Sequence, residues 1–305
     1  MDLSQVDVQT LLDDLDIEYK KSGKNVTSGW VEVNCPFCGD PSYHLGISPT
    51  NLFHCWRCGE KGNLIKYLKE TLQKNFGEVK SIVEKYVSEE YIYKLISKPK
   101  IFNCDNPALN EHIKKYMPKS VFLYLQERGF EPNKISAKYR LKFFSNIGEF
   151  KFRIFVPVFE KGTLVTFTAR DYSGEAKVKY LHNKGVPVKN YLYNVDSVKD
   201  NVLIVEGATD VWRMGDGAVA TFGIQYTKEQ VLKLSRLAVE KAVVMFDDEE
   251  VAQAQATKLA QDLAPYIEEV KVVYFHKDEG GKDPAEWFST NEEAEQMKEN
   301  IFKEG

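Results

Sequence analysis

The chain has 305 residues, 43% of them hydrophobic, which is enough for about two domains with packed cores. No apolar run approaches the roughly 20 residues that span a bilayer, and the first residues lack the basic-then-apolar order of a signal peptide, so we expect neither a membrane protein nor a secreted one. The net charge of −4 is unevenly distributed: residues 1–130 are neutral, residues 131–190 carry +7 and residues 191–305 carry −11. This order suits a protein that binds a polyanion in one place and metal cations in another, although a solvated acidic surface would give the same sum.

Four of the five cysteines form two Cys-x-x-Cys pairs, Cys35 with Cys38 and Cys55 with Cys58, and a glycine follows each pair. Four thiolates at this spacing can close a tetrahedron around zinc, while the glycine turns let backbone amides point at the sulfurs. Such a closed site leaves no position for a substrate, so the sequence predicts a structural Zn²⁺ in a small β ribbon. The alternative is two pairs of redox-active or free thiols. The fifth cysteine, Cys104, is expected to be a buried small apolar residue.

The remaining chain divides by composition and by apolar period. A Lys/Glu/Tyr-rich stretch at 74–100 predicts a helix or linker, and a hairpin is expected at 151–158 and 163–169, where apolar residues alternate around a Lys161-Gly162 turn. We therefore place domains at 1–75 (zinc ribbon), 76–115 (linker or helical connector), 116–200 (basic subdomain), 201–290 (metal-binding subdomain) and 291–305 (terminal helix or tail).

The 201–290 segment alternates short apolar runs with stretches of helical length. The runs fall at 202–205, 218–221, 242–246 and 270–275, and segments 227–238 and 251–266 have helical apolar spacing. Strands that alternate with helices indicate a mostly parallel sheet. The expected fold class is α/β: a small β zinc ribbon, then an α+β basic part, then a mostly parallel sheet with flanking helices.

Acidic residues follow three of the predicted strands. Glu206-Gly207 ends the first strand with Asp210 four residues beyond, the run Asp247-Asp248-Glu249-Glu250 ends a second, and Asp283 follows a third. The carboxyl edge of a parallel sheet is where open α/β sheets bind ligands, and helical spacing brings Asp210 near Glu206. Clustered carboxylates repel unless cations neutralise them, so we expect a hard divalent ion such as Mg²⁺ or Mn²⁺ here.

The order of these motifs resembles that of bacterial and bacteriophage DNA primases, whose catalytic core contains the Toprim fold. The resemblance extends over about 25–70 and 120–290, and it includes the segments 152–157, Ala169-Arg170 and 179–183, which look like basic motifs of that family. It implies that Glu206 acts at the catalytic centre, that Asp247 and Glu249 hold Mg²⁺ or Mn²⁺ with Glu206, and that Asp210 and Asp283 belong to the same catalytic cluster.

The resemblance also implies how the basic segment binds nucleic acid and nucleotide. Arg153, Arg170 and Lys179 match residues that contact template, nucleotide phosphates or primer, and the wider basic set includes Lys142, Lys151 and Lys177. Because Arg153 falls on the polar face of its predicted strand, we expect it to be available to solvent or ligand. Two departures from the family stand out: Asp247-x-Glu249 replaces the usual Asp-x-Asp, and four cysteines replace a set that often includes histidine.

The resemblance predicts a primase, an enzyme that copies single-stranded DNA into short RNA primers from ribonucleoside triphosphates. The chain has no Gly-x-x-x-x-Gly-Lys-Ser/Thr loop, so a separate replicative helicase is the expected partner, and the four-cysteine ribbon favours a bacteriophage protein acting in bacterial cytoplasm. Two alternatives stay open: a Toprim nuclease or topoisomerase-like enzyme, and a non-catalytic zinc–Toprim mediator of recombination. The sequence leaves the oligomeric state undetermined.

Overall fold

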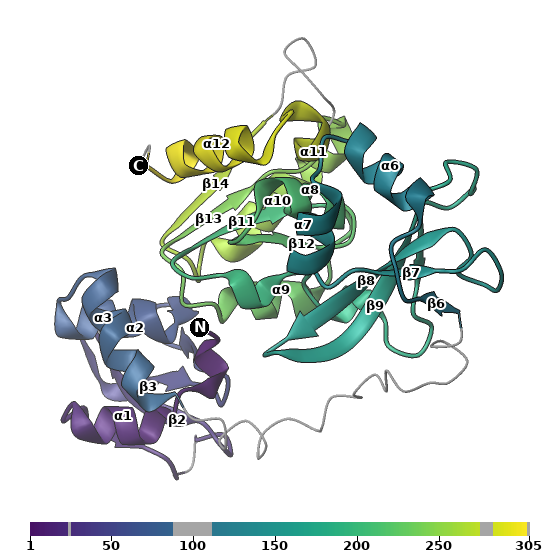
Figure 1. Cartoon of the computed structure of the whole chain (residues 1–305). Helices are drawn as coiled ribbons and strands as arrows, with labels where there is room; N and C mark the ends of the chain where they lie inside the picture. Colours follow the sequence, from purple (N-terminus) through teal and green to yellow (C-terminus); the bar gives the residue numbers. More distant parts are fainter. Residues whose placement is uncertain (24–25, 88–111, 275–282, 304–305) are drawn as a thin grey trace.

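The structure is a computed structural model that describes residues 1–23, 26–87, 112–274 and 283–303 (Figure 1). Cys104 and the Gly280-Gly281-Lys282 part of the third acidic motif lie outside the described residues. Three sheets follow one another along the chain, and each has its own helices. No described helix is long and apolar enough to cross a membrane.

The first module is an antiparallel sheet of order β1-β2-β3-β4-β5 covered by helices. Its elements are η1 (Leu3–Gln5), α1 (Val8–Asp14), β1 (Tyr19–Lys20), β2 (Val31–Cys35), β3 (Asp40–Ile47), β4 (Leu52–Cys55), β5 (Lys61–Asn63), α2 (Leu64–Leu72), α3 (Phe76–Val83) and η2 (Glu84–Tyr86). The helices begin at side-chain caps, for example Asp7 on α1 and Asn75 on α3. α3 lies in the stretch predicted as connector, yet Phe76, Val79 and Val83 are buried in the same apolar cluster as the ribbon strands. Its packing therefore places α3 with the ribbon module.

The second module is an antiparallel sheet of order β10-β9-β8-β7-β6. It contains β6 (Ile113–Lys114), α6 (Lys119–Glu127), α7 (Pro132–Lys138), β7 (Lys142–Phe144), β8 (Arg153–Glu160), β9 (Thr163–Asp171), β10 (Tyr180–His182), η3 (Val188–Asn190) and η4 (Val195–Ser197). β8 and β9 form the predicted hairpin, with Lys161 and Gly162 at its turn, both at positive φ. One face of the sheet packs on the main core and the other on a small aromatic cluster around Phe155.

The third module is a parallel sheet of order β12-β11-β13-β14, as the alternating pattern predicted. Its elements are β11 (Asn201–Val205), α8 (Ala208–Met214), β12 (Ala218–Ala220), α9 (Lys228–Ser235), β13 (Lys241–Val244), α10 (Glu250–Leu263), β14 (Glu269–Val272), α11 (Pro284–Trp287) and α12 (Asn291–Lys303). β11 and β13 are central and almost wholly buried, because both faces of a parallel sheet are covered by helices. The mixed α/β fold class is confirmed.

The ribbon module contacts the amino end of this parallel sheet. Leu3 N donates to Arg236 O at 2.7 Å and Ala238 N donates to Met1 O at 2.9 Å, just before β13 begins. Lys80 pairs with Asp200, which precedes β11, at 2.5 Å. In Figure 1 the ribbon accordingly lies at one end of the sheet, beside α9. It is docked at the end opposite to the strand ends that carry the predicted catalytic acids.

Candidate zinc centre and candidate active site

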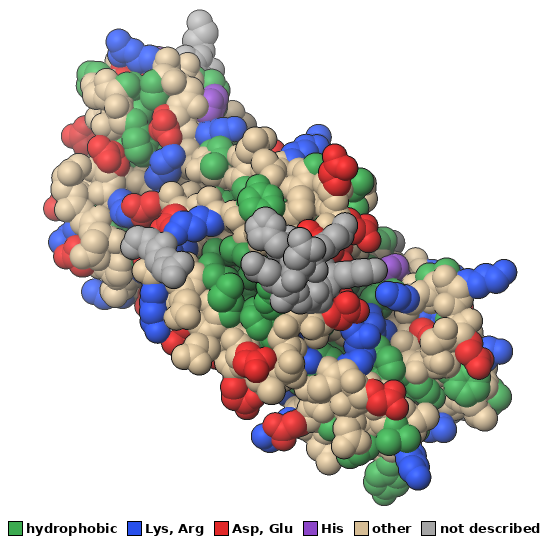
Figure 2. Space-filling view, turned by 90° about the horizontal axis from the view of Figure 1, so that it is seen from above, with side chains coloured by type: hydrophobic (Ala, Val, Ile, Leu, Met, Phe, Trp, Pro, Cys, Tyr) green, Lys and Arg blue, Asp and Glu red, His purple; other side chains and the backbone are tan. Residues whose placement is uncertain are grey.

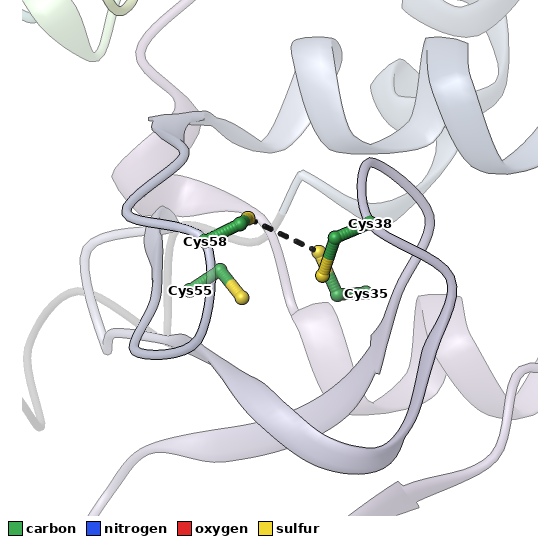
Figure 3. A group of neighbouring side chains, drawn as sticks. All are labelled: Cys35, Cys38, Cys55 and Cys58. Carbon is green, nitrogen blue, oxygen red and sulfur yellow. Dashed lines mark hydrogen bonds between the residues drawn. The ribbon is translucent and has the colours of Figure 1, made fainter.

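The four cysteines converge on one point from two turns. Cys35 ends β2 and Cys55 ends β4, and Figure 3 shows all four sulfurs turned toward one another. The four Sγ atoms lie within 4.8 Å of one another, and Cys35 Sγ lies 3.9 Å from Cys58 Sγ. A zinc tetrahedron with Zn–S bonds of about 2.3 Å has edges of about 3.8 Å, so the thiols fit a zinc ion in their present positions.

Backbone amides support these thiols. The N–H groups of Arg57 and Cys58 hydrogen bond to the Cys55 sulfur, and against the opposing effect of burial they hold the pKa of this thiol below its ordinary value. The N–H groups of Phe37 and Cys38 likewise bond to the Cys35 sulfur, and Gly39 and Gly59, at φ +67° and +79°, follow these two turns. The sequence predicted these amide contacts from the glycine that follows each pair.

A buried carboxylate ties the two cysteine turns together. Asp40 follows the first turn and accepts hydrogen bonds from His44 Nδ1 at 2.7 Å and from Arg57 Nη1 at 2.5 Å, and Arg57 lies within the second turn. Burial alone would raise the pKa of Asp40, but these two partners hold it below its ordinary value. The sequence analysis did not single out Asp40, because its partners are assembled only in the folded ribbon.

The predicted catalytic acids gather at the carboxyl edge of the parallel sheet. Glu206 follows β11, and its Oε1 accepts a hydrogen bond from the Asp247 backbone N–H, beyond β13, at 2.9 Å. Asp210 lies on the first turn of α8 and accepts the Gly207 N–H at 2.8 Å. A Cβ at Gly207 would lie 3.1 Å from this Asp210 oxygen, so glycine gives the carboxylate room to fold back.

Glu249 and Asp283 complete the set at the starts of two helices. Glu249 precedes α10 and is exposed, and Asp283 caps α11 by accepting the Glu286 N–H at 2.8 Å. The loop that carries Asp247 is held by Gln253, whose side-chain amide donates to the carbonyls of Phe246 and Asp247.

The pKa values show that these carboxylates share one electrostatic environment. Burial, followed by repulsion from the other four acids, raises the pKa of Asp247 to about 9. Burial and the charge of Asp283 raise the pKa of Asp210, and burial with nearby acids raises that of Glu206. A group of acids that raise one another's pKa values at a sheet edge is typical of a functional site.

The spacing of the acids is looser than that of the cysteines. Across the described ranges, the four cysteines are the one group of three or more Cys, His, Asp or Glu whose ligand atoms all lie within 4.8 Å. However, Asp210 Oδ1, Asp247 Oδ1 and Asp248 Oδ2 are buried without a hydrogen-bond partner. Unpaired buried carboxylate oxygens are costly, and hard divalent cations prefer oxygen ligands of this kind. The donor set therefore fits Mg²⁺ or Mn²⁺.

The prediction that Arg153 is open to solvent is wrong. Its side chain is 5% exposed, and its guanidinium donates to the backbone carbonyls of Ala169, Val178 and Lys179. The expected alternation holds from Arg153 to Val158, but Phe152, which the pattern placed on the apolar face, precedes β8 and is exposed. The face that carries Arg153 is covered by the segment before β10. Arg153 therefore acts as a structural link between β8 and residues 178–179.

Arg170 is also buried, but it faces the acids. Its Nε donates to Tyr124 Oη and its Nη1 to Tyr180 Oη, both at 2.6 Å, and it lies over the Tyr180 ring. The charge of Arg170 opposes the rise in the pKa of Asp210. Tyr180 Oη lies close to Gly207, since a Cβ added at this glycine would be 3.9 Å from that oxygen. The second module therefore brings an arginine and a tyrosine to the acid cluster.

The other predicted basic residues, Lys142, Lys151, Lys177 and Lys179, are all exposed and so able to reach a polyanion. On the face seen in Figure 2, acidic and basic side chains are interspersed rather than separated into two areas. The basic and acidic segments of the sequence therefore do not form two separate charged areas on this face.

Lys189 was missed by the sequence analysis although it lies at the same site. Its Nζ donates to the carbonyls of Thr221, Gly223 and Gln225, beyond β12, and its charge opposes the rise that burial and nearby acids cause in the pKa of Glu206. Burial, followed by the charge of Lys189, lowers the pKa of His182 on β10. Only the folded chain brings Lys189 next to Glu206, so spacing in the sequence gave no indication of it.

The chain thus combines a four-cysteine ribbon, an antiparallel sheet, and a parallel sheet with acids at its carboxyl edge. Residues 3–96 match the family model described as CHC2 zinc finger. A DNA primase of Campylobacter jejuni is 27% identical, with 95% of this chain and 54% of the relative covered. A DNA primase of Lactococcus lactis is 24% identical, with 82% and 47% covered.

The chain thus spans about half the length of the curated relatives it matches. The zinc-binding and RNA polymerase domains of the Aquifex aeolicus primase superpose with a TM-score of 0.50 at 19% identity, covering 97% of this chain and 83% of that one, which shows a shared fold. The resemblance to bacterial-type DNA primases is confirmed, as is the zinc-binding cysteine cluster.

Proposed function

We propose that the chain is a DNA primase that synthesises short RNA primers on single-stranded DNA from ribonucleoside triphosphates. The observation that carries the proposal is the cluster of Glu206, Asp210, Asp247, Glu249 and Asp283, in which burial and then the charges of the other four acids raise the pKa of Asp247. Such repulsion is tolerated where divalent cations and a triphosphate are bound. The similarity to primases over most of the chain supports the same conclusion.

Glu206, Asp247 and Glu249 are the residues that would hold Mg²⁺ or Mn²⁺. When bound, the ion would neutralise the triphosphate and stabilise charge that develops on the α-phosphate during transfer. Glu206 has a raised pKa because of burial and nearby acids, so it is suited to accept the proton of the attacking 3′-hydroxyl. The Asp247 N–H donates to Glu206 Oε1 at 2.9 Å and so fixes the position of this carboxylate.

Basic groups from the second module would position the nucleic acid and the nucleotide. Lys142, Lys151, Lys177 and Lys179 are free to contact phosphates, since all are exposed. Arg170, although buried, offsets negative charge at Asp210 and holds Tyr180 against the acid cluster. The zinc ribbon would select the start site on the template. A separate helicase partner, the bacterial cytoplasm as site of action and a bacteriophage origin stay predictions.

The test is ribonucleotide incorporation on single-stranded DNA templates with Mg²⁺ or Mn²⁺, run beside nicking of supercoiled DNA. We expect labelled RNA primers from the wild-type chain and none from Asp247→Asn. Glu250→Gln is the matched control, because Glu250 lies in the same acidic run but is exposed at the start of α10. Nicking without incorporation would instead favour a Toprim nuclease. DNA binding with neither activity would favour a non-catalytic mediator of recombination.

A further inference from the structure

An aromatic side chain is exposed where β8 begins, in a conformation that aromatic residues rarely adopt. Phe152 is 38% exposed and has a left-handed backbone with φ +56°. This conformation costs free energy for a bulky residue, and such costs are most often kept where the side chain has a task. The Phe152 ring meets the ring of Tyr172 edge-to-face, with centroids 6.4 Å apart. The Tyr172 N–H donates to Phe152 O at 3.2 Å, so the two residues are also joined through the backbone.

Lysines flank this aromatic pair, and the buried Arg153 fixes some of them in place. Lys151 precedes Phe152 and is exposed. Arg153, the next residue, donates from Nη2 to Val178 O at 2.8 Å and from Nη1 to Lys179 O at 3.0 Å. These bonds hold the segment 177–179, whose three side chains are all exposed, next to the start of β8. Aromatic rings among lysines are the composition of surfaces that bind single-stranded nucleic acid.

The aromatic pair and the acid cluster border the same apolar core. Tyr172 packs against the main apolar core, which also contains Val205 and Ala208 on either side of Glu206. Lys179 is followed by Tyr180, whose hydroxyl group is held by Arg170 next to Gly207. A strand bound along Lys177 and Lys179 would therefore run toward the carboxylates.

We propose that Phe152 and Tyr172 form a stacking platform for an unpaired base of the single-stranded DNA template, while Lys151, Lys177 and Lys179 contact the adjacent phosphates. The occupant is nucleic acid rather than protein because the apolar surface is small and is flanked by the exposed lysines at 151, 177 and 179. The platform would orient the template before it reaches the acids. This inference rests on the proposed function, which it deepens by locating the path of the template.

The experiment measures binding of the whole chain to a fluorescent single-stranded oligonucleotide and to an abasic oligonucleotide of the same length, over a range of salt concentrations. Phe152→Gly removes the ring and suits the left-handed backbone, so the fold should be kept. We expect it to weaken binding of the ordinary oligonucleotide by about 5- to 100-fold, the range for loss of one base stack, with little effect on the abasic one. Its salt dependence should match that of the wild type, because a ring neutralises no phosphate.

Three further variants separate stacking from other causes. Phe152→Tyr keeps a ring and should bind within about twofold of the wild type. Lys177→Ala should weaken binding of both oligonucleotides. It should also reduce the steepness of log K against log salt concentration by about 0.7, the value for one phosphate contact on a single strand. Leu232→Ala removes an exposed apolar side chain from α9 and should change nothing.

The proposed platform would be refuted if Phe152→Gly and the wild type bound the ordinary oligonucleotide with equal affinity. It would also be refuted if Phe152→Gly lost affinity equally for the ordinary and the abasic oligonucleotide. Failure of the proposed function would look different: the wild type would incorporate no ribonucleotides, whereas the effect of Phe152→Gly on base-dependent binding would remain.

Discussion

Asp247→Asn should make the protein less sensitive to rising pH when no Mg²⁺ or Mn²⁺ is added. The pKa of Asp247 is about 9 in the folded protein, because of burial and then of four neighbouring acids, against an ordinary value of 3.8. Between about pH 4 and 9 the unfolded chain has lost this proton and the folded chain keeps it. Each rise in pH within that window therefore favours unfolding, and the stability is fully present only below the window.

The magnitude follows from the same linkage. A full difference of one proton changes the free energy of unfolding by about 1.4 kcal/mol per pH unit. Asp247 is half-buried and solvent screens its neighbours, which lowers the pH at which the folded chain loses this proton, so we count about half of the roughly 2.8 kcal/mol that one full proton would give between pH 6 and pH 8. From pH 6 to pH 8 the wild type should lose about 1.4 kcal/mol, which corresponds to about 3–6 °C in Tm for a chain of this size.

Differential scanning fluorimetry at pH 6, 7 and 8, with zinc kept bound, measures this slope. Asp247→Asn should have the flatter profile, and Glu250→Gln should keep that of the wild type. Adding Mg²⁺ should raise the wild-type Tm at pH 8 more than that of Asp247→Asn. Parallel pH profiles for the wild type and Asp247→Asn would refute the assignment of a strongly raised pKa to this residue.

Three other substitutions test the zinc ribbon and the burial of Arg153. Cys58→Ser should reduce bound zinc from about one equivalent to almost none by elemental analysis, and retention of the metal would show that the ligands are wrongly assigned. Arg153→Gln should lower the free energy of unfolding by about 1–3 kcal/mol, because it leaves the carbonyls of 178–179 unpaired. A denaturant titration measures this, and an unchanged unfolding midpoint would contradict the burial of Arg153. Gly46→Ala should destabilise the ribbon, since the new Cβ would lie 2.4 Å from the Trp56 ring, and an unchanged Tm together with unchanged tryptophan fluorescence would count against that contact.

The sequence predicted the elements whose pattern is local. The zinc site followed from two short motifs, and the parallel sheet followed from apolar runs that alternate with helical stretches. The acids at 206 and 247 follow buried strands directly, so the rule for parallel sheets was enough to bring them to one edge.

Long-range contacts explain what the sequence did not predict. Arg153 lies on a polar strand position, but nothing local shows that residues 178–179 cover it. Arg170 meets Tyr124, 46 positions earlier, and Lys189 reaches the loop after β12 only through tertiary packing. The contact of Leu3 with Arg236 likewise joins segments that no periodicity relates.

The most direct test of the account is a crystal structure of the protein with Mn²⁺ and a ribonucleoside triphosphate, with anomalous scattering recorded at the manganese edge. We predict a manganese peak among Glu206, Asp247 and Glu249, in contact with the triphosphate. Carboxylates that point apart, with no manganese between them, would contradict the proposed catalytic site.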